Sequence, residues 1–397
     1  MSAEVISLGC RLNLSESEEL RGMLAGERDL VVINSCAVTA EAVRQTRQAI
    51  RRARRERPDA RLLVTGCAAE VERAAIAAMP EVDGLIANAA KLDPRAWNVA
   101  PAQAMLHGLH SRAFIAVQNG CDHACTFCVI PQGRGPSRSL SISAVLREVA
   151  RHLERGAREA VLTGVDLTSW GHDLPDAPAL GALVAAILAE FPALARLRLS
   201  SLDGIEIDPL LFDLIASEPR VMPHAHLSLQ HGNDLILKRM KRRHLRGDAV
   251  ALVAGLRARR PGLAVGADLI AGFPTETDAM FERSLSLADD CGLTFLHVFP
   301  YSVRKDTPAA KMPQVTGAIV KLRAARLRSK GADIVSAFLE SQIGRHHVVL
   351  MENGGIGRTP QFAEVVMQAP NVPPAGTMLR VHVAQRAGSQ LIGEVAG

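Results

Sequence analysis

Six of the seven cysteines in this chain of 397 residues fall into two groups of three. The close triad consists of Cys121, Cys125 and Cys128, and the dispersed triad consists of Cys10, Cys36 and Cys67. A 4Fe-4S cluster has four irons and is normally held by four cysteines, so a group of three leaves one iron open to a ligand from outside the protein. The cysteines therefore predict two 4Fe-4S clusters, each with one iron free to take part in chemistry.

The close triad has the spacing C-x-x-x-C-x-x-C, with which a short loop can wrap a cubane cluster and present three sulfurs to it. A zinc site is the alternative, with His123 as a candidate ligand. Structural zinc sites commonly use two C-x-x-C or Cys/His pairs, however, and no second pair lies nearby. Disulfides are a further alternative, which we disfavour because nothing in the sequence marks the chain as secreted.

Each cysteine of the dispersed triad directly follows a short run rich in β-branched residues and leucine, with helical sequence after it. These runs with their cysteines are residues 4–10, 30–36 and 61–67. Repeated strand and helix segments predict a buried parallel sheet, and ligands bind beyond the carboxyl ends of such strands. We therefore expect the three cysteines to meet at one edge of the sheet. A buried core cysteine is the alternative for any one of them, and it is our interpretation of Cys291.

Two segments resemble the radical S-adenosylmethionine (SAM) methylthiotransferase family, and the similarity runs from about Val5 to the C-terminus. Residues 114–139, FIAVQNGCDHACTFCVIPQGRGPSRS, are similar to the family's cysteine loop and to the I-P-x-x-R-G-x-S-R-S segment after it. Residues 8–13, LGCRLN, resemble the first cysteine motif of the branch that modifies threonylcarbamoyladenosine in tRNA. Sister branches, which act on isopentenyladenosine in tRNA or on an aspartate of a ribosomal protein, carry different residues between that cysteine and the asparagine.

The resemblance implies an enzyme with two 4Fe-4S clusters and SAM as cofactors. The cluster on the close triad would bind SAM and, on one-electron reduction, cleave it to a 5'-deoxyadenosyl radical that removes hydrogen from carbon 2 of the modified adenosine. The cluster on the dispersed triad would carry the sulfur, methylated by a second SAM, that is inserted there. The implied partners are a tRNA anticodon stem-loop and a low-potential electron donor such as flavodoxin or ferredoxin.

Two other functions stay open at this point. A sister methylthiotransferase would differ only in its substrate, which would be isopentenyladenosine in tRNA or a ribosomal-protein aspartate. A non-catalytic iron-sulfur regulator that binds RNA and senses redox state would bind tRNA without cleaving SAM.

Strand-like and helix-like segments alternate through the middle of the chain, which predicts an incomplete (βα)6 barrel like that of the family. The strands are expected at residues 113–118, 159–163, 196–200, 225–230, 264–270 and 295–299. The helices are expected at residues 143–155, 180–190, 209–217, 248–259 and 277–291. Active sites of barrels lie at the carboxyl ends of the strands, and the close triad follows the first strand at that end.

Polar residues and glycines follow the other strands, and they predict a SAM site because SAM needs hydrogen-bond partners for its ribose and adenine. The residues expected to contact SAM are Gly164, Asp166, Ser201, Asp203, Gln230, Gly272 and Phe273, together with Phe127, which the resemblance places near the adenine. Each segment taken alone would more often be an ordinary turn between a strand and a helix. Their shared position supports the prediction, which includes no catalytic side chain beyond the cluster ligands.

Short β runs separated by Gly and Pro begin after about Ser336, and they predict a small antiparallel barrel. This segment resembles the TRAM domain with which family members hold RNA. The full expectation is an α/β protein with an open parallel α/β domain at residues 1–105, a radical SAM barrel at residues 106–335 and a TRAM-like β-barrel at residues 336–397.

The net charge of +5 and the pI near 9.0 suit a polyanionic partner such as tRNA. Arginines crowd residues 44–61, and a second basic run covers residues 238–246, so both segments are candidates for phosphate contacts. A solvated helix face is the alternative for the first run. Aromatic residues make up only 3% of the chain, so charge and shape should dominate RNA binding over base stacking.

No run of the sequence reaches the roughly 18–20 apolar residues that a membrane span needs. Residues 6–10, ISLGC, imitate a lipoprotein cleavage site, but no basic and apolar leader precedes them. We therefore expect a cytoplasmic enzyme with no membrane partner.

Overall fold

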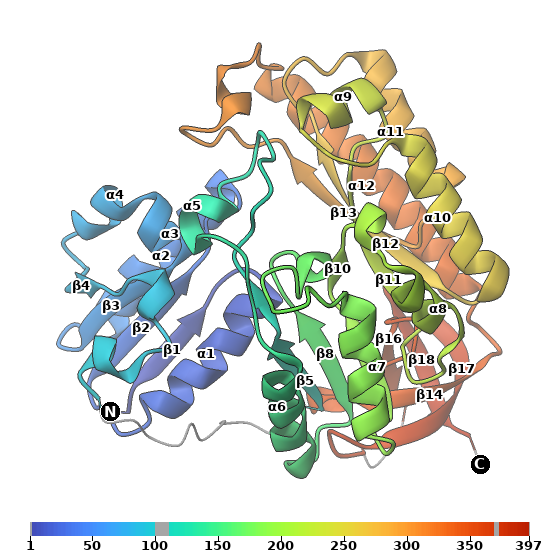
Figure 1. The fold of residues 1–397 in the computed structure, drawn as a ribbon, viewed down its shortest axis with the longest axis horizontal. Coiled ribbons are helices and arrows are strands. Elements are labelled where there is room, and N and C mark those ends of the chain that lie inside the picture. The colour runs from blue at the N-terminus through green and yellow to red at the C-terminus, as the bar shows by residue number, and fades with distance from the viewer. Residues whose placement is uncertain (1, 100–110, 369–372, 397) are drawn as a thin grey trace.

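Three structural parts follow one another along the chain in the computed structural model, which describes residues 2–99, 111–368 and 373–396 (Figure 1). The N-terminal part lies beside the first strand of the central part, and the C-terminal part lies below the central strands in the view of Figure 1. The predicted domain boundary between residues 105 and 106 lies outside the described residues.

A four-stranded parallel sheet forms the N-terminal part, as the strand and helix repeat predicted. Its strands, in sheet order, are β1 (Glu4–Ser7), β2 (Leu30–Ser35), β3 (Arg61–Gly66) and β4 (Gly84–Leu85). The helices of this part are α1 (Arg11–Met23), α2 (Ala40–Glu56), α3 (Cys67–Val71) and α4 (Arg73–Ala77). All six residues of β2 are buried, because helices cover both faces of a parallel sheet.

The central part contains every strand and helix predicted for the barrel, with ends that differ by no more than two residues. The strands are β5 (Arg112–Ala116), β8 (Glu159–Thr163), β9 (Arg196–Leu199), β11 (His224–Gln230), β12 (Ala264–Ala271) and β13 (Phe295–Pro300). The helices between them are α6 (Ile142–Glu154), α7 (Leu180–Glu190), α8 (Pro209–Ser217), α10 (Arg246–Arg259) and α11 (Asp278–Asp290). These helices lie outside the strands in Figure 1.

The barrel sheet divides at β9. Strands β5, β8 and β9 form one parallel sheet, and the short strand β10 (Ser201–Leu202) joins β11, β12 and β13 in a second. A single bridge between Leu197 and Val221 spans the division. Two short antiparallel strands, β6 (Gln118–Asn119) and β7 (Arg138–Ser139), close the loop that carries the close triad and helix α5 (Ile130–Arg134). Helix α9 (Asp234–Arg239) follows β11.

Five strands close into a small barrel at the C-terminal end. In barrel order they are β14 (His346–Met351), β15 (Ile356–Arg358), β16 (Glu364–Met367), β18 (Gln390–Val395) and β17 (Met378–Ala387). Four of the neighbouring pairs are antiparallel, as predicted, whereas β16 and β18 run parallel. This difference has a geometric cause, because strands of alternating direction cannot close a ring that has an odd number of members.

Helix α12 (Gly317–Glu340) connects the two barrels as one continuous helix of 24 residues. It runs through residues 335 and 336, so the predicted boundary there falls inside a helix and stays a prediction. Within the described ranges, every helix is too short or too polar to cross a lipid bilayer.

Candidate iron-sulfur and cofactor site

The three thiols of the dispersed triad meet at the carboxyl edge of the N-terminal sheet. Cys10 caps the start of α1, Cys36 directly follows β2, and Cys67 is the first residue of α3. Burial raises the pKa of the Cys36 thiol, and the nearby Cys10 and Cys67 raise it further. Gly9 has φ +94°, and a Cβ there would lie 2.7 Å from Cys36 Sγ, so the turn before Cys10 requires a glycine.

Positive charge and hydrogen-bond donors surround Cys67, which is the environment that an anionic iron-sulfur cluster needs. Burial raises the pKa of the Cys67 thiol, whereas the charges of Arg134 and Lys91 oppose that rise. Asn88 Nδ2 lies 4.0 Å from Cys67 Sγ and also donates to the Gly133 carbonyl at 2.5 Å. The donor set therefore fits a cluster held by the dispersed triad.

The close triad lies on the loop between β6 and α5, at the carboxyl end of the barrel strands. Cys128 Sγ accepts a hydrogen bond from Ile130 N at 3.4 Å, and Arg242 Nη1 lies 3.8 Å from Cys125 Sγ. Burial raises the pKa of Cys121 to about 12 and that of Cys128 to about 11. Thiolates at these positions need a compensating positive charge, which the irons of a cluster would provide.

The two triads face each other across the interface between the N-terminal part and the barrel. Cys67 contributes to the raised pKa of Cys128, so the two groups lie close enough for their negative charges to repel each other. Helix α5 brings Gly133 against Cys67 so closely that a Cβ at Gly133 would lie 3.2 Å from Cys67 Cβ. The sequence could predict two clusters, but only the tertiary structure shows that their expected ligands share one interface.

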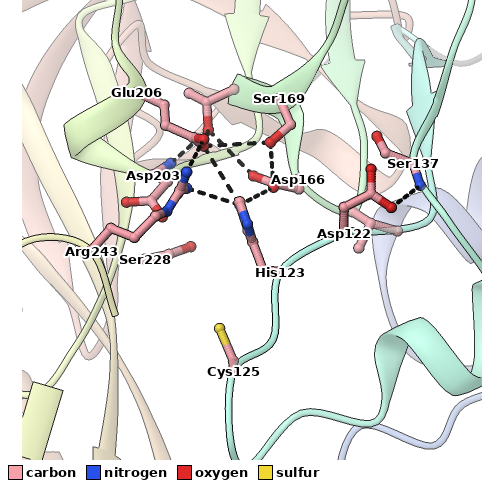
Figure 2. Close-up of polar contacts among 12 residues, drawn as sticks. Asp122, His123, Cys125, Ser137, Asp166, Ser169, Asp203, Glu206, Ser228 and Arg243 are labelled. Carbon is pink, nitrogen blue, oxygen red and sulfur yellow. Dashed lines mark hydrogen bonds and ion pairs between the residues drawn. The ribbon is translucent and has the colours of Figure 1, made fainter. Parts of the chain in front are cut away.

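A group of charged residues lies beside the close triad (Figure 2). His123 Nε2 lies 2.5 Å from Asp166 Oδ2 and 3.7 Å from Glu206 Oε2, and Arg243 binds Glu206 with 2.5 Å between Nη1 and Oε1. Hydrogen bonds to Asp166 and Glu206 raise the pKa of His123 to about 10. Asp203 accepts from Arg242 at 2.8 Å. Two of the residues predicted to contact SAM, Asp166 and Asp203, are thus held in ion pairs in this structure.

Donor atoms of Cys121, His123 and Asp166 lie within 4.8 Å of one another, as a metal site would require. In this structure, however, His123 Nε2 is engaged by Asp166 at 2.5 Å, so these residues form part of an ion-pair network. Sequence reasoning missed Glu206 as a member of this group. The available signal was its position three residues after Asp203, in the same loop beyond the third barrel strand.

The other residues predicted to contact SAM occupy both sides of the barrel mouth. Phe127 packs edge-on against Phe273, with ring centroids 6.4 Å apart, and Glu276 Oε2 accepts hydrogen bonds from Gly272 N at 2.9 Å and from Phe273 N at 3.2 Å. Gln230 ends β11 with φ +64°, a strained conformation for a residue with a side chain.

Gly164 and Ser201 lie on the other side of the mouth, with Asp166 and Asp203. Gln118 Oε1 accepts from Val165 N at 2.9 Å and from Asp166 N at 3.0 Å, which fixes the turn after β8. Ser201 is the first residue of β10. The predicted residues therefore flank the close triad in two groups, and their contacts with SAM stay a prediction.

The first basic run, which extends from α2 to the start of β3, divides into structural and exposed arginines. Arg54 donates to the carbonyls of Glu81, Pro58 and Ala60, and Arg57 is buried, so these two hold the fold. The exposed arginines of the run are Arg44, Arg51, Arg52, Arg55 and Arg61. They form the arginine face, which remains a candidate for phosphate contacts.

The second basic run divides in the same way. Arg246 is buried and donates to the carbonyl of Gly232, and Arg242 reaches Asp203 and Cys125. Lys238, Lys241 and Arg243 are exposed. Part of this run therefore supports the barrel mouth rather than a nucleic-acid surface.

Sequence reasoning also missed a cluster of arginine side chains inside the barrel. Phe362, from the loop between β15 and β16, lies within 4.8–5.3 Å of the guanidinium carbons of four arginines: Arg11, Arg112, Arg198 and Arg358. Burial, together with Arg112 and Arg198, lowers the pKa of Arg11 to about 10. Three structural parts contribute to this group, so no local pattern could have indicated it.

Comparisons with known proteins cover almost the whole chain. Residues 115–288 match the Radical SAM superfamily, and residues 2–87 match a family described as Uncharacterized protein family UPF0004. The threonylcarbamoyladenosine tRNA methylthiotransferase MtaB of Rickettsia prowazekii is 44% identical over 91% of this chain and 90% of its own length. The threonylcarbamoyladenosine tRNA methylthiotransferase MtaB of Aquifex aeolicus is 32% identical over 87% of this chain and 92% of its own length.

More distant similarity extends to other enzymes. A tRNA-2-methylthio-N(6)-dimethylallyladenosine synthase of Cereibacter sphaeroides is 30% identical over 98% of this chain and 97% of its own length. Among solved structures, the radical SAM methyltransferase TsrM of Kitasatospora setae matches with a TM-score of 0.53 and 17% identity, covering 75% of this chain and 68% of that one. At this identity the likeness shows the fold alone, which is the mixed α/β radical SAM fold predicted from the sequence.

Proposed function

Because this chain belongs to the radical SAM methylthiotransferases, in the branch whose members modify threonylcarbamoyladenosine in tRNA, we propose that it converts that nucleoside to its 2-methylthio derivative. The reaction replaces the hydrogen on carbon 2 of the adenine with a methylthio group. Its cofactors are SAM and two 4Fe-4S clusters, and its substrate is tRNA. The proposal also includes the anticodon stem-loop as the part bound, a low-potential electron donor such as flavodoxin or ferredoxin, and the cytoplasm as the location.

The facing arrangement of the two triads is the observation that carries this proposal. The charge of Cys67 in the dispersed triad raises the pKa of Cys128 in the close triad, and α5 packs directly on Cys67. When bound, SAM and the cluster of the close triad supply the radical that takes hydrogen from carbon 2, and the second cluster supplies the sulfur. A substrate base at this interface would reach both, which a reaction of this kind requires.

The residues around the triads have supporting roles in this proposal. Arg134 and Lys91 supply positive charge beside the thiolate of Cys67. Gln118 and Glu276 fix the turns after β8 and β12, the two segments expected to contact SAM from opposite sides. The rings of Phe127 and Phe273 provide an apolar wall that excludes water from that space.

Nucleoside analysis of tRNA tests the proposal directly. Cells that lack the gene should retain threonylcarbamoyladenosine and lose its 2-methylthio derivative, and the intact gene should restore the derivative whereas a Cys125→Ala variant should not. Loss of 2-methylthio-isopentenyladenosine instead would identify a sister substrate. Unchanged nucleosides, together with tRNA binding in the absence of SAM cleavage, would support the non-catalytic regulator.

A further inference from the structure

Charged side chains line the lumen of the central barrel toward the amino ends of its strands, which we call the lower ends. Alternate residues of each strand face the helices, so the residues between them face the lumen. The lumen-facing residues at the lower ends include Arg112 on β5, Glu159 on β8, and Arg198 on β9. Phe362 of the C-terminal barrel has φ +77° and packs against His224 of β11 with ring centroids 5.5 Å apart. We call this group, with Arg11 and Arg358, the lumen floor.

Arg11 differs from the other cations of the lumen floor because no carboxylate binds it. The carboxylates of the lumen and its rim already have partners: Glu159 binds Arg198 at 2.8 Å, Glu352 binds Arg112 at 2.6 Å, Glu364 binds Arg358 at 2.6 Å, and Asp268 contacts His226 at 2.8 Å. Among the described residues, the Arg11 side chain has neither a hydrogen bond nor an ion pair. Glu159 lies close enough to favour the charged form of Arg11, but it is bound to Arg198, so the half-buried Arg11 guanidinium has no anion bound to it directly.

One further donor of the lumen floor also lacks a partner. Arg198 Nη1 is buried without a hydrogen-bond partner among the described residues. The Arg198 side chain is 0% exposed. Buried polar groups nearly always have partners, because an unmade hydrogen bond costs the full desolvation of the group. The unpaired donor of Arg198 therefore adds to the unmatched positive charge of the lumen floor beside Arg11.

A purely structural role for these arginines is the competing explanation. Guanidinium groups over an aromatic ring are attractive, and the contacts with Phe362 help to seat the C-terminal barrel. That role explains Arg198 and Arg358, which also bind Glu159 and Glu364. It does not explain why Arg11, from the N-terminal part, enters a region that is already rich in positive charge.

We propose that Arg11, supported by the lumen floor, binds the carboxylate of the threonylcarbamoyl group of the substrate nucleoside. This inference rests on the proposed function, since that group supplies the anion. A planar guanidinium matches a carboxylate with two parallel hydrogen bonds, and the match is stronger in a water-poor site. Arg11 follows Cys10, an expected ligand of the cluster that supplies sulfur, so one short segment would place both the sulfur donor and the group that selects the nucleoside.

Arg11 is therefore a specificity-determining residue in this proposal. An isopentenyl or dimethylallyl group carries no charge and accepts no hydrogen bond. Such a group in the same place would leave Arg11 buried and unpaired, which is unfavourable. A site built to bind a charged group rejects the analogue that lacks it more strongly than an apolar site rejects a small change of shape.

A thermodynamic cycle, in which the Arg11 side chain and the carboxylate of the RNA are changed separately and together, tests the inference. The anaerobically reconstituted holoenzyme and its Arg11→Gln variant are titrated with three synthetic anticodon stem-loops, which carry threonylcarbamoyladenosine, its methyl ester or unmodified adenosine. For the wild type we expect the ester to bind about 10- to 100-fold more weakly than the acid, as loss of a hydrogen bond to a charged group implies. Arg11→Gln should weaken binding of the acid by a similar factor and make binding indifferent to the ester.

Matched variants and iron analysis complete the experiment. Arg328→Gln removes one guanidinium from the exposed side of α12 and should leave the preference for the acid unchanged. Arg11→Lys keeps the charge without the planar fork and should keep only part of the preference. Iron content is measured for every variant, so that loss of a cluster near Cys10 is recognised. If Arg11→Gln has lost iron, Arg11→Lys replaces it in the cycle.

The outcomes separate this inference from the proposed function. If the wild type methylthiolates the acid-bearing RNA but Arg11→Gln and Arg11→Lys retain the full preference for the acid, the inference is wrong and the function stands. Equal weakening of all three RNAs by Arg11→Gln would also overturn it, because Arg11 would then contact phosphate or hold the fold. If the wild type forms no methylthio product on the acid-bearing RNA, the proposed function itself fails.

Discussion

Arg134 of α5 binds Glu16 of α1 with 2.8 Å between Nη1 and Oε1, and the two side chains are 1% and 2% exposed. Lys91 binds the other oxygen of Glu16 at 2.5 Å, and Arg134 also donates to Asn13 Oδ1 at 2.5 Å. This buried network joins the loop of the close triad to the helix that begins after Cys10. It therefore fixes the two triads relative to each other, and its two cations exceed its one carboxylate by one positive charge, which acts on Cys67.

Removal of one partner from this network should be strongly destabilising. For Arg134→Ala we expect the free energy of unfolding to fall by about 3 kcal/mol or more, because Glu16 and Asn13 would each lose a buried hydrogen bond to a charged group, worth about 1.5–3 kcal/mol. Chemical denaturation under anaerobic conditions measures the change. Arg52→Ala is the matched control, since its pair with Glu56 is exposed and 3.6 Å long, and it should cost less than about 1 kcal/mol. Equal effects of the two variants would contradict a role for burial.

Glu19 predicts a dependence of stability on pH. It lines a cavity of about 370 Å³ between α1, β5 and α6, where burial and the nearby Glu148 raise its pKa to about 7. The folded protein therefore holds this proton more tightly than the unfolded chain, and the free energy of unfolding should fall as the pH rises from about 4.5 to about 7. The loss is at most about 3 kcal/mol.

The variant Glu19→Gln should abolish this fall and make the protein more stable than the wild type above pH 7. Melting temperatures at a series of pH values measure the effect. Glu190→Gln, at the exposed end of α7, is the control and should leave the pH profile unchanged. A wild-type profile that stays flat across the window would show that Glu19 is ionised without cost.

Iron content tests the assignment of the two triads. The reconstituted chain should hold about eight irons, and joint replacement of Cys121, Cys125 and Cys128 by Ala should reduce the number to about four. Cys291→Ala should retain all of them, because this cysteine is a buried residue at the C-terminal end of α11 and is far from both triads along the chain. Unchanged iron in the triple variant would refute the assignment.

The two triads should have separable roles. Replacement of Cys10, Cys36 and Cys67 by Ala should preserve reductive cleavage of SAM to 5'-deoxyadenosine and abolish the methylthio product, because only the close triad is needed to form the radical. Chromatography of both products measures the split. Loss of SAM cleavage in a variant that remains folded and keeps about four irons would show that the roles are not divided in this way.

The arginine face of α2 should contribute to tRNA binding through phosphate contacts. Reversal of Arg51, Arg52 and Arg55 to Glu should weaken binding and flatten its dependence on salt, because fewer counterions are released. Arg54 is left intact, since it binds three carbonyls and its loss would disturb the fold. Reversal of Lys321 and Arg328 on the exposed side of α12 is the control. A slope of binding constant against salt that matches the wild type would exclude the arginine face.

The sequence by itself determined the features that depend on local pattern. The two triads, the strands that precede Cys10, Cys36 and Cys67, and the alternation of strands and helices in the barrel could all be predicted from spacing and apolar periodicity. Such features are local because strand formation and loop geometry depend on neighbours along the chain. Even the parallel arrangement of β1, β2 and β3 follows from the helices that connect them.

Only the tertiary structure decided which charges hold the fold and which are left exposed or unpaired. Glu16 and Arg134 are separated by 118 positions, and nothing near either residue marks the other as its partner. Arg54 and Arg55 are identical neighbours in sequence, yet one binds carbonyls and the other faces solvent. Arg11 lies beside Phe362 because three parts of the chain meet at the lumen floor. An ion pair or an unpaired cation depends on burial and distance in three dimensions, and neither quantity is written in a local pattern.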